Sequence, residues 1–190
     1  MLKNLKDLSR KLDLNTGRVD SEPQQVRRLS DLVDFFADKD AANAGLQKED
    51  PVIYKVSLVE PADGPGDMYY GLGWLAPGKI AGEYYFTKGH FHEWREAAEV
   101  YIALKGRGRM LLEHEQSGES RLVDFNADSV VYVPGYAAHR TINVGDEPLV
   151  YLGIYPAAAG HDYGAIADRN FKQVVIEKQN EPQLLDREDL

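Results

Sequence analysis

The stretch that decides the fold is His90-Phe91-His92, which is followed along the chain by Glu99 and His139. Side chains alternate between the two faces of a β-strand, so His90 and His92 are expected to point the same way while Phe91 points into the opposite packing layer. Glu99 begins a second alternating run and is expected to face the two histidines from a neighbouring strand. His139 follows a β-branched run and a proline turn, where another strand begins. Three imidazoles and one carboxylate in this arrangement predict a divalent-metal site.

The intervals around these residues resemble the two sequence motifs of the cupin superfamily. Glu99 stands the usual distance before Gly106, and residues 134–143 match the second motif. The first motif often places its glutamate closer to the second histidine, which would select Glu96. Glu99 is preferred because its interval to Gly106 and its place in an alternating strand both fit. The resemblance implies an all-β fold, the cupin double-stranded β-helix or jelly-roll barrel, with short N-terminal helices.

A closer resemblance extends from about residue 26 to residue 177. It is carried by these stretches: Arg27-Arg28-Leu29-Ser30-Asp31, Asp50-Pro51-Val52-Ile53-Tyr54, Tyr85-Phe86-Thr87-Lys88-Gly89-His90-Phe91-His92, Ala98-Glu99-Val100-Tyr101, Tyr132-Val133-Pro134, Ala138-His139-Arg140-Thr141 and Gly160-His161-Asp162-Tyr163-Gly164. They are similar to the cupin-type, or archaeal-type, glucose-6-phosphate isomerase family. The resemblance implies a cytoplasmic, metal-dependent aldose-ketose isomerase that interconverts glucose 6-phosphate and fructose 6-phosphate in glycolysis and gluconeogenesis. It also implies a homodimer in which the amino-terminal arm can cross to the partner.

The same resemblance implies roles for individual residues. The expected catalytic residues are Glu99, His161 and Tyr101. The expected substrate-binding residues are Tyr54, Thr87, Gly89, Tyr155 and Tyr163, with Tyr54 beside the sugar and the other four beside its phosphate. Packing inside the barrel is the alternative reading for each tyrosine. Gly73 departs from the family, which places a phosphate-binding threonine there, so a different sugar phosphate stays open as the substrate.

The expected metal ligands are His90, His92, Glu99 and His139. They would leave two positions free on an octahedral ion, where a carbonyl oxygen and an adjacent hydroxyl could bind. Iron(II) is expected, with manganese or zinc as alternatives, because a mixed nitrogen and oxygen shell with exchangeable positions suits these ions. Glu99 is a candidate base, but a carboxylate bound to a dication has lowered basicity. A direct hydride shift between the two carbons therefore stays an alternative to proton transfer through an enediol.

Two other functions share this pattern of ligands. An iron or manganese cupin oxidase or dioxygenase uses the same shell to bind oxygen, and oxygen consumption would identify it. A non-catalytic cupin that senses a sugar phosphate would bind its ligand without turnover.

Composition narrows the class of protein further. The chain has 190 residues, no cysteine and a formal net charge of −9. This length suits one barrel, and the missing cysteines exclude a disulfide framework and a cysteine nucleophile. The acidic balance disfavours nucleic acid as a partner. The sequence contains neither the apolar core of a secretory signal nor a stretch long enough to span a membrane, so no membrane partner is expected.

Periodicity predicts three regions along the chain. Residues 1–50 are expected to form an N-terminal arm and short helices, near 31–37 and 39–47, that pack on the barrel. Residues 51–180 are expected to form the cupin barrel and residues 181–190 a solvated acidic tail. Within the barrel the alternation predicts these strands: 52–60, 67–76, 79–87, 98–104, 107–114, 120–125, 129–133, 140–144, 148–155 and 172–178.

Overall fold

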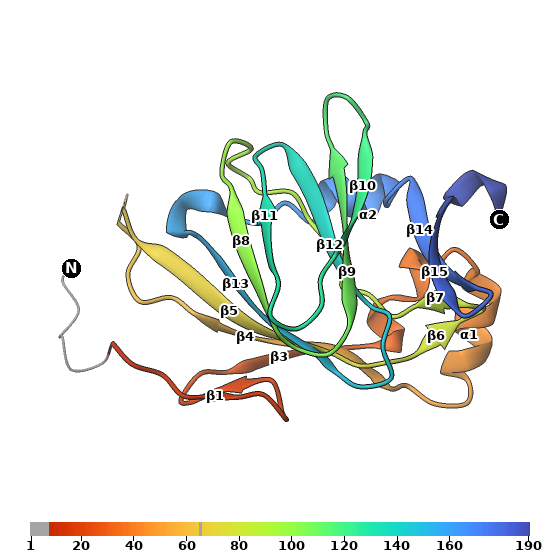
Figure 1. Cartoon of the computed structure of the whole chain (residues 1–190), viewed down its shortest axis with the longest axis horizontal. Helices are drawn as coiled ribbons and strands as arrows, with labels where there is room; N and C mark the ends of the chain where they lie inside the picture. Colours follow the sequence, from red (N-terminus) through yellow and green to blue (C-terminus); the bar gives the residue numbers. More distant parts are fainter. Residues whose placement is uncertain (1–7, 65) are drawn as a thin grey trace.

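The computed structural model describes residues 8–64 and 66–190, and β-strands are the main regular secondary structure of this chain (Figure 1). A six-stranded sheet has the order β11 (Val130–Val133), β8 (Glu99–Lys105), β13 (Leu149–Pro156), β5 (Met68–Leu75), β4 (Val52–Val59) and β3 (Gln24–Arg28). A three-stranded sheet has the order β10 (Ser120–Asp124), β9 (Gly108–His114) and β12 (Ala137–Asn143). All neighbouring strands in both sheets are antiparallel.

Two smaller sheets complete the strand arrangement. One has the order β15 (Glu181–Asp186), β14 (Gln173–Lys178), β7 (Glu83–Tyr84) and β6 (Lys79–Ile80), and lies beside α1 at the right of the view in Figure 1. The other pairs β1 (Leu12–Asp13) with β2 (Arg18–Val19).

The helices are short and lie outside the two large sheets. The α-helices are α1 (Lys39–Leu46) and α2 (Gly164–Arg169), and the 3₁₀ turns are Leu29–Asp31, Val33–Phe35, Ala157–Ala159 and Arg187–Asp189. Helix α1 begins where it does because the Asp38 carboxylate accepts a hydrogen bond from the backbone N–H of Ala41, at 2.8 Å, which satisfies an otherwise unpaired donor. No helix among residues 8–64 and 66–190 is both long and apolar enough to cross a membrane.

The core lies between the facing large sheets. Its largest fully buried side chains include Phe86, Phe91, Met110 and Phe125. Strand β8 shows why the sheet has an inner and an outer face, since buried residues alternate along it with partly exposed ones. Burying each such large apolar side chain contributes roughly 1.5–3 kcal/mol. The predicted all-β jelly roll with short N-terminal helices is confirmed.

Several predicted boundaries differ from the structure. The strand predicted over 79–87 is two short strands separated by a turn, because Ala81 and Gly82 both have positive φ. The helix predicted over 31–37 is a pair of 3₁₀ turns. Strand β12 begins at residue 137 instead of 140.

The ends of the predicted barrel also differ. The prediction of a solvated tail is wrong for residues 181–186, which form β15 and pair with β14 along its whole length. The large sheet also begins before residue 51, because β3 pairs with β4. No alternation of apolar residues marks β15 in the sequence, and its pairing with the preceding strand β14 is what makes it regular. The expected arm falls partly on residues 1–7, which lie outside the described residues.

Candidate metal centre

His90 and His92 lie in an extended segment that is anchored to β12, although it is not the continuous strand predicted. The backbone N–H of His90 donates to the carbonyl of His139, at 3.3 Å, and the N–H of His139 donates back to His90, at 3.1 Å. Phe91 pairs in the same way with Asp162 on the other side. Side chains still alternate in such an extended segment, so Phe91 enters the core while the two histidines face the barrel interior.

Gly89 makes this close approach possible. Its φ is +75°, and a Cβ at this position would lie 2.8 Å from the carbonyl oxygen of His139. Any other residue would push the histidine segment away from β12.

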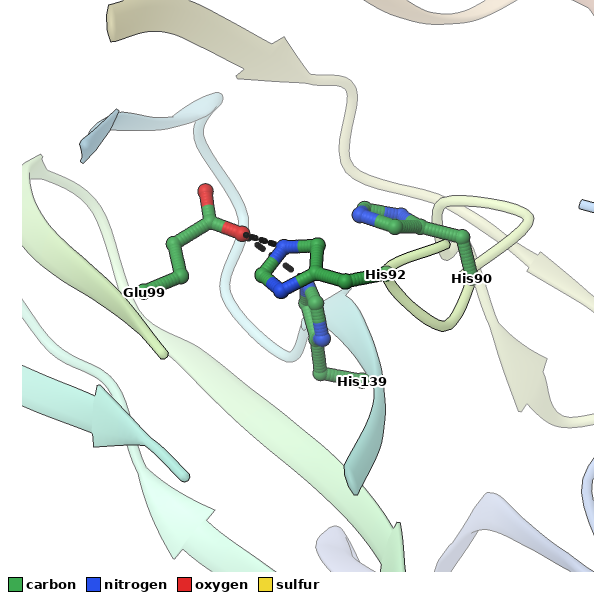
Figure 2. Close-up of side chains that lie close together, drawn as sticks. All are labelled: His90, His92, Glu99 and His139. Carbon is green, nitrogen blue, oxygen red and sulfur yellow. Dashed lines mark hydrogen bonds and ion pairs between the residues drawn. The ribbon is translucent and has the colours of Figure 1, made fainter. Parts of the chain in front are cut away.

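The structure brings His90, His92, Glu99 and His139 together. Glu99 is the first residue of β8 and His139 lies on β12, so three separate segments supply the group. One potential ligand atom from each residue lies within 4.8 Å of all the others, and all four residues are buried (Figure 2). The alternative carboxylate, Glu96, points elsewhere and accepts a hydrogen bond from the hydroxyl of Tyr136 at the surface.

Hydrogen bonds orient two of the imidazoles. Nδ1 of His92 lies 3.0 Å from the carbonyl oxygen of Ala97, and Nδ1 of His139 lies 3.3 Å from that of Ala137. Since a carbonyl can only accept, each Nδ1 carries the proton and each Nε2 presents a lone pair to the cluster. Both Nε2 atoms lie near Glu99 Oε2, at 3.2 Å for His92 and 3.1 Å for His139.

Two buried nitrogens in the cluster lack hydrogen-bond partners. Among the described residues none hydrogen-bonds to Nε2 of His90, and Nε2 of His139 is close to Glu99 without the geometry of a hydrogen bond. Buried polar atoms without partners carry a free-energy cost, so their presence on one cluster needs an explanation. A cation bound among the four side chains would satisfy them.

The electrostatics of the cluster favour the protonation states that bind metals. Burial of Glu99 alone would raise its pKa, but the neighbouring imidazoles of His139 and His92 lower the pKa to about 2. Burial, together with the neighbouring histidines, holds the pKa of His90 well below its ordinary value. An ionised carboxylate beside neutral imidazoles is the state that a divalent cation requires.

A cavity of about 520 Å³ opens beside this cluster. His90, Glu99 and His139 line it, whereas His92 is not among the lining residues. All of the other predicted site residues also line it: Tyr54, Thr87, Gly89, Tyr101, Tyr155, His161 and Tyr163.

His161 stands close to the cluster. Its ring centroid is 4.4 Å from that of His90, and the ring of Tyr163 lies nearly parallel to it, with centroids 5.8 Å apart and planes at 11°. Burial, opposed by Glu99 and reinforced by His92 and His139, lowers the pKa of His161 to about 4. His161 is therefore neutral near pH 7 and is a weaker base than an exposed histidine.

Five further lining residues with polar or charged side chains were not among the predicted site residues: Gln25, Arg27, Lys88, Thr141 and Tyr151. Lys88 and Arg27 bring positive charge to the wall of the cavity. Arg140 supports Lys88 from behind, since its guanidinium donates to the Lys88 carbonyl at 2.8 Å and lies over the ring of Phe86. The place of Lys88 at the cavity could have been predicted from the sequence, because it stands next to Gly89. The places of the other four residues depend on which strands pair.

A jelly-roll barrel with three histidines and one glutamate gathered at its cavity defines a cupin with a candidate metal centre. The family model described as "Glucose-6-phosphate isomerase (GPI)" matches residues 26–189. The chain therefore belongs to the glucose-6-phosphate isomerase family.

Individual relatives agree with this family. The glucose-6-phosphate isomerase of Pyrococcus horikoshii is 48% identical over 176 residues, which cover 93% of each chain. The enzyme of the same name from Thermococcus litoralis is 45% identical over 168 residues, which cover 88% of each chain. Among solved structures, Bacillus subtilis oxalate decarboxylase aligns with a TM-score of 0.43 and 28% identity over 54% of this chain and 25% of that one, a partial likeness that is too weak to inform function.

Proposed function

We propose that this chain interconverts glucose 6-phosphate and fructose 6-phosphate in the cytoplasm, with a divalent metal ion held by His90, His92, Glu99 and His139. The proposal rests on the agreement between the family to which the chain belongs and the side chains at its candidate metal centre. Relatives named glucose-6-phosphate isomerase are 47% identical over 93% of this chain, and four side chains that can bind a metal gather beside the cavity. A coupled assay of fructose 6-phosphate conversion tests it. Oxygen consumption without isomerisation would instead indicate an oxidase.

The donor set fits a cation such as iron(II), with manganese or zinc as alternatives. The two unpartnered imidazole nitrogens and the ionised Glu99 carboxylate support this proposal. When bound, such an ion would polarise the substrate carbonyl and stabilise negative charge on the adjacent oxygens.

Glu99, His161 and Tyr101 are the proposed catalytic residues, because each has an acid or base group beside the cluster. Glu99 is ionised, so its carboxylate can take a proton from one substrate carbon and return it to the next. The Tyr101 hydroxyl hydrogen-bonds to Glu99, and burial followed by the charge of Glu99 raises the pKa of Tyr101 well above its ordinary value. Tyr101 therefore keeps its proton and can hold the carboxylate in place. His161 is neutral and can exchange a proton with a substrate oxygen.

The proposed substrate-binding residues Tyr54, Thr87, Gly89, Tyr155 and Tyr163 supply hydroxyl groups and a glycine backbone to the same cavity. We place the phosphate beside Thr87 and Gly89, because Lys88 and Arg27 line the cavity with them and attract a dianion.

Replacing Tyr163 by phenylalanine is expected to raise the KM for fructose 6-phosphate by about fivefold, because one hydrogen bond that is equally strong in ground and transition states is lost. Tyr163 is 51% exposed, so the fold should be unaffected. Steady-state kinetics measures the effect. A large fall in kcat with KM unchanged would contradict binding as the role of this hydroxyl.

We also propose a homodimer that uses the outer face of the large sheet. The strand register places these apolar side chains together on the face away from the cavity: Val100, Ile102, Val130, Tyr132, Leu152 and Ile154. Val130 and Tyr132 are 64% and 63% exposed, which is unusual for large apolar residues that neighbour one another. Light scattering tests this proposal, and a monomeric molar mass at micromolar concentration would contradict it.

A further inference from the structure

Gly73 and Tyr151 occupy one space on the wall of the cavity. The register of β13 and β5 sets Tyr151 directly opposite Gly73. A Cβ built on Gly73 would lie 2.2 Å from Cζ and 2.6 Å from the hydroxyl oxygen of Tyr151. The end of the tyrosine ring therefore fills the volume that any other side chain at position 73 would need.

A chain of hydroxyl groups leads to Tyr151 from the opposite wall. The Thr141 hydroxyl donates to the hydroxyl oxygen of Tyr151 at 3.1 Å. The hydroxyl oxygens of Thr87 and Thr141 are 3.2 Å apart, and Thr87 also accepts the backbone N–H of Thr141 at 3.1 Å. A hydroxyl carries one hydrogen, and that of Thr141 is used on Tyr151, so the hydrogen between the two threonines belongs to Thr87.

The hydroxyl hydrogen of Tyr151 stands at the end of this series of hydrogen bonds and is free to bind an acceptor in the cavity. Among the described residues none accepts a hydrogen bond from the Tyr151 hydroxyl, although Tyr151 and Thr141 are both buried and both line the cavity. Burial raises the pKa of Tyr151 above its ordinary value, so the group keeps its hydrogen. Accepting a bond from Thr141 also strengthens it as a donor, because linked hydrogen bonds polarise one another.

Tyr151 lies far enough from Glu99 along β13 to contact the end of the substrate that is away from the reacting carbons. On β13, Gly153 lies against Glu99, since a Cβ there would be 2.6 Å from the Glu99 carboxylate. Tyr151 is the next residue on the same face, so its backbone lies about 7 Å further along the strand. Its hydroxyl chain ends at Thr87, next to Lys88. A dianion placed there can accept the free hydrogen.

We propose that Tyr151 is a specificity-determining residue of this chain: its hydroxyl donates to the substrate phosphate, and Gly73 is required because it leaves room for the ring. This rests on the proposed isomerase function. The hydroxyl of Thr87 also supports this chain of hydroxyl groups through its contact with Thr141.

The test is Tyr151→Phe, which removes the hydroxyl and keeps the ring over Gly73. Loss of a hydrogen bond to a charged group should raise the KM for fructose 6-phosphate about tenfold or more, with kcat within about twofold. The dissociation constant of inorganic phosphate, measured by calorimetry, should rise by a similar factor, because phosphate alone carries the contact. Metal content should be unchanged. The matched control is Tyr136→Phe, which removes the surface hydroxyl bonded to Glu96 and should leave both constants as they are.

A second variant tests the partnership with Gly73. Gly73→Ala should displace the tyrosine ring and weaken phosphate binding in the native background. In the Tyr151→Phe background the same change should weaken phosphate binding much less, because the hydroxyl is already gone. Equal weakening in both backgrounds would contradict the partnership. Should Gly73→Ala fail to fold, Tyr151→Phe alone decides the proposal.

Two outcomes would overturn the role of Tyr151 while leaving the isomerase function intact. One is an unchanged KM in Tyr151→Phe. The other is a raised KM with unchanged affinity for inorganic phosphate, which would place the hydroxyl on the sugar. If the unaltered protein does not isomerise fructose 6-phosphate, the proposed function is wrong. The calorimetric comparison of inorganic phosphate then still decides Tyr151, because weaker binding by Tyr151→Phe supports its role and equal binding overturns it.

Discussion

Replacing His139 by alanine is expected to remove the bound metal and lower the rate of isomerisation by at least about a hundredfold, since even indirect disturbance of metal ligands costs about 10–100-fold. The side chain supplies a buried Nε2 that the described residues leave without a hydrogen bond. The backbone pairing of residue 139 with His90 does not depend on the imidazole, so the barrel should stay folded. Metal analysis, the coupled assay and circular dichroism measure these effects.

Glu96→Ala is the matched control for the ligand set. Glu96 is the alternative carboxylate, and it bonds to Tyr136 outside the cluster. This variant should therefore keep its metal and its activity. Full activity in His139→Ala, or metal loss in Glu96→Ala with retention in Glu99→Ala, would show that the ligands are assigned wrongly.

Replacing Glu99 by glutamine is expected to lower turnover by about two to four orders of magnitude, which is the usual contribution of a positioned general base. Glutamine has nearly the same shape, so it fits the space above Gly153, where no Cβ competes with the side chain. Its amide cannot accept a proton as a carboxylate does. The comparison is made at matched metal occupancy, because the amide is also a weaker ligand.

Isomerisation in deuterium oxide, stopped early, separates the two possible routes. Transfer through Glu99 allows exchange with solvent, so deuterium should appear at the carbon that receives the hydrogen. A direct hydride shift carries the original hydrogen across and incorporates none. If Glu99→Gln kept both its metal and near-native turnover, the base role of Glu99 would have to be abandoned.

Sequence reasoning predicted the candidate site better than the exact strands. His90, His92, Glu99 and His139 were found because alternation in extended chain depends only on local backbone geometry, which holds even where His90 forms an isolated bridge. The strand over 79–87 was wrong because positive φ at Ala81 and Gly82 interrupts the pattern. The wall formed by Tyr151 and Gly73 could not be predicted, because it depends on the register between β13 and β5.

The charged segment at the end of the described chain shows the same limit. Its composition indicates a solvated tail, and residues 181–186 are indeed mostly not buried. Backbone pairing with β14 nevertheless makes them a strand, and such pairing leaves no trace in the hydrophobic pattern of an edge strand. Positions fixed by local chemistry can therefore be read from the sequence, while positions fixed by strand partners cannot.

The most direct test of a metal-dependent isomerase is the rate of fructose 6-phosphate conversion by one protein preparation in three states: as purified, after removal of metal by a chelator, and after addition of iron(II). The four buried donors predict that conversion is lost on chelation and restored by iron(II), with one ion bound per chain. Full conversion by the metal-free protein would contradict the proposed role of the site.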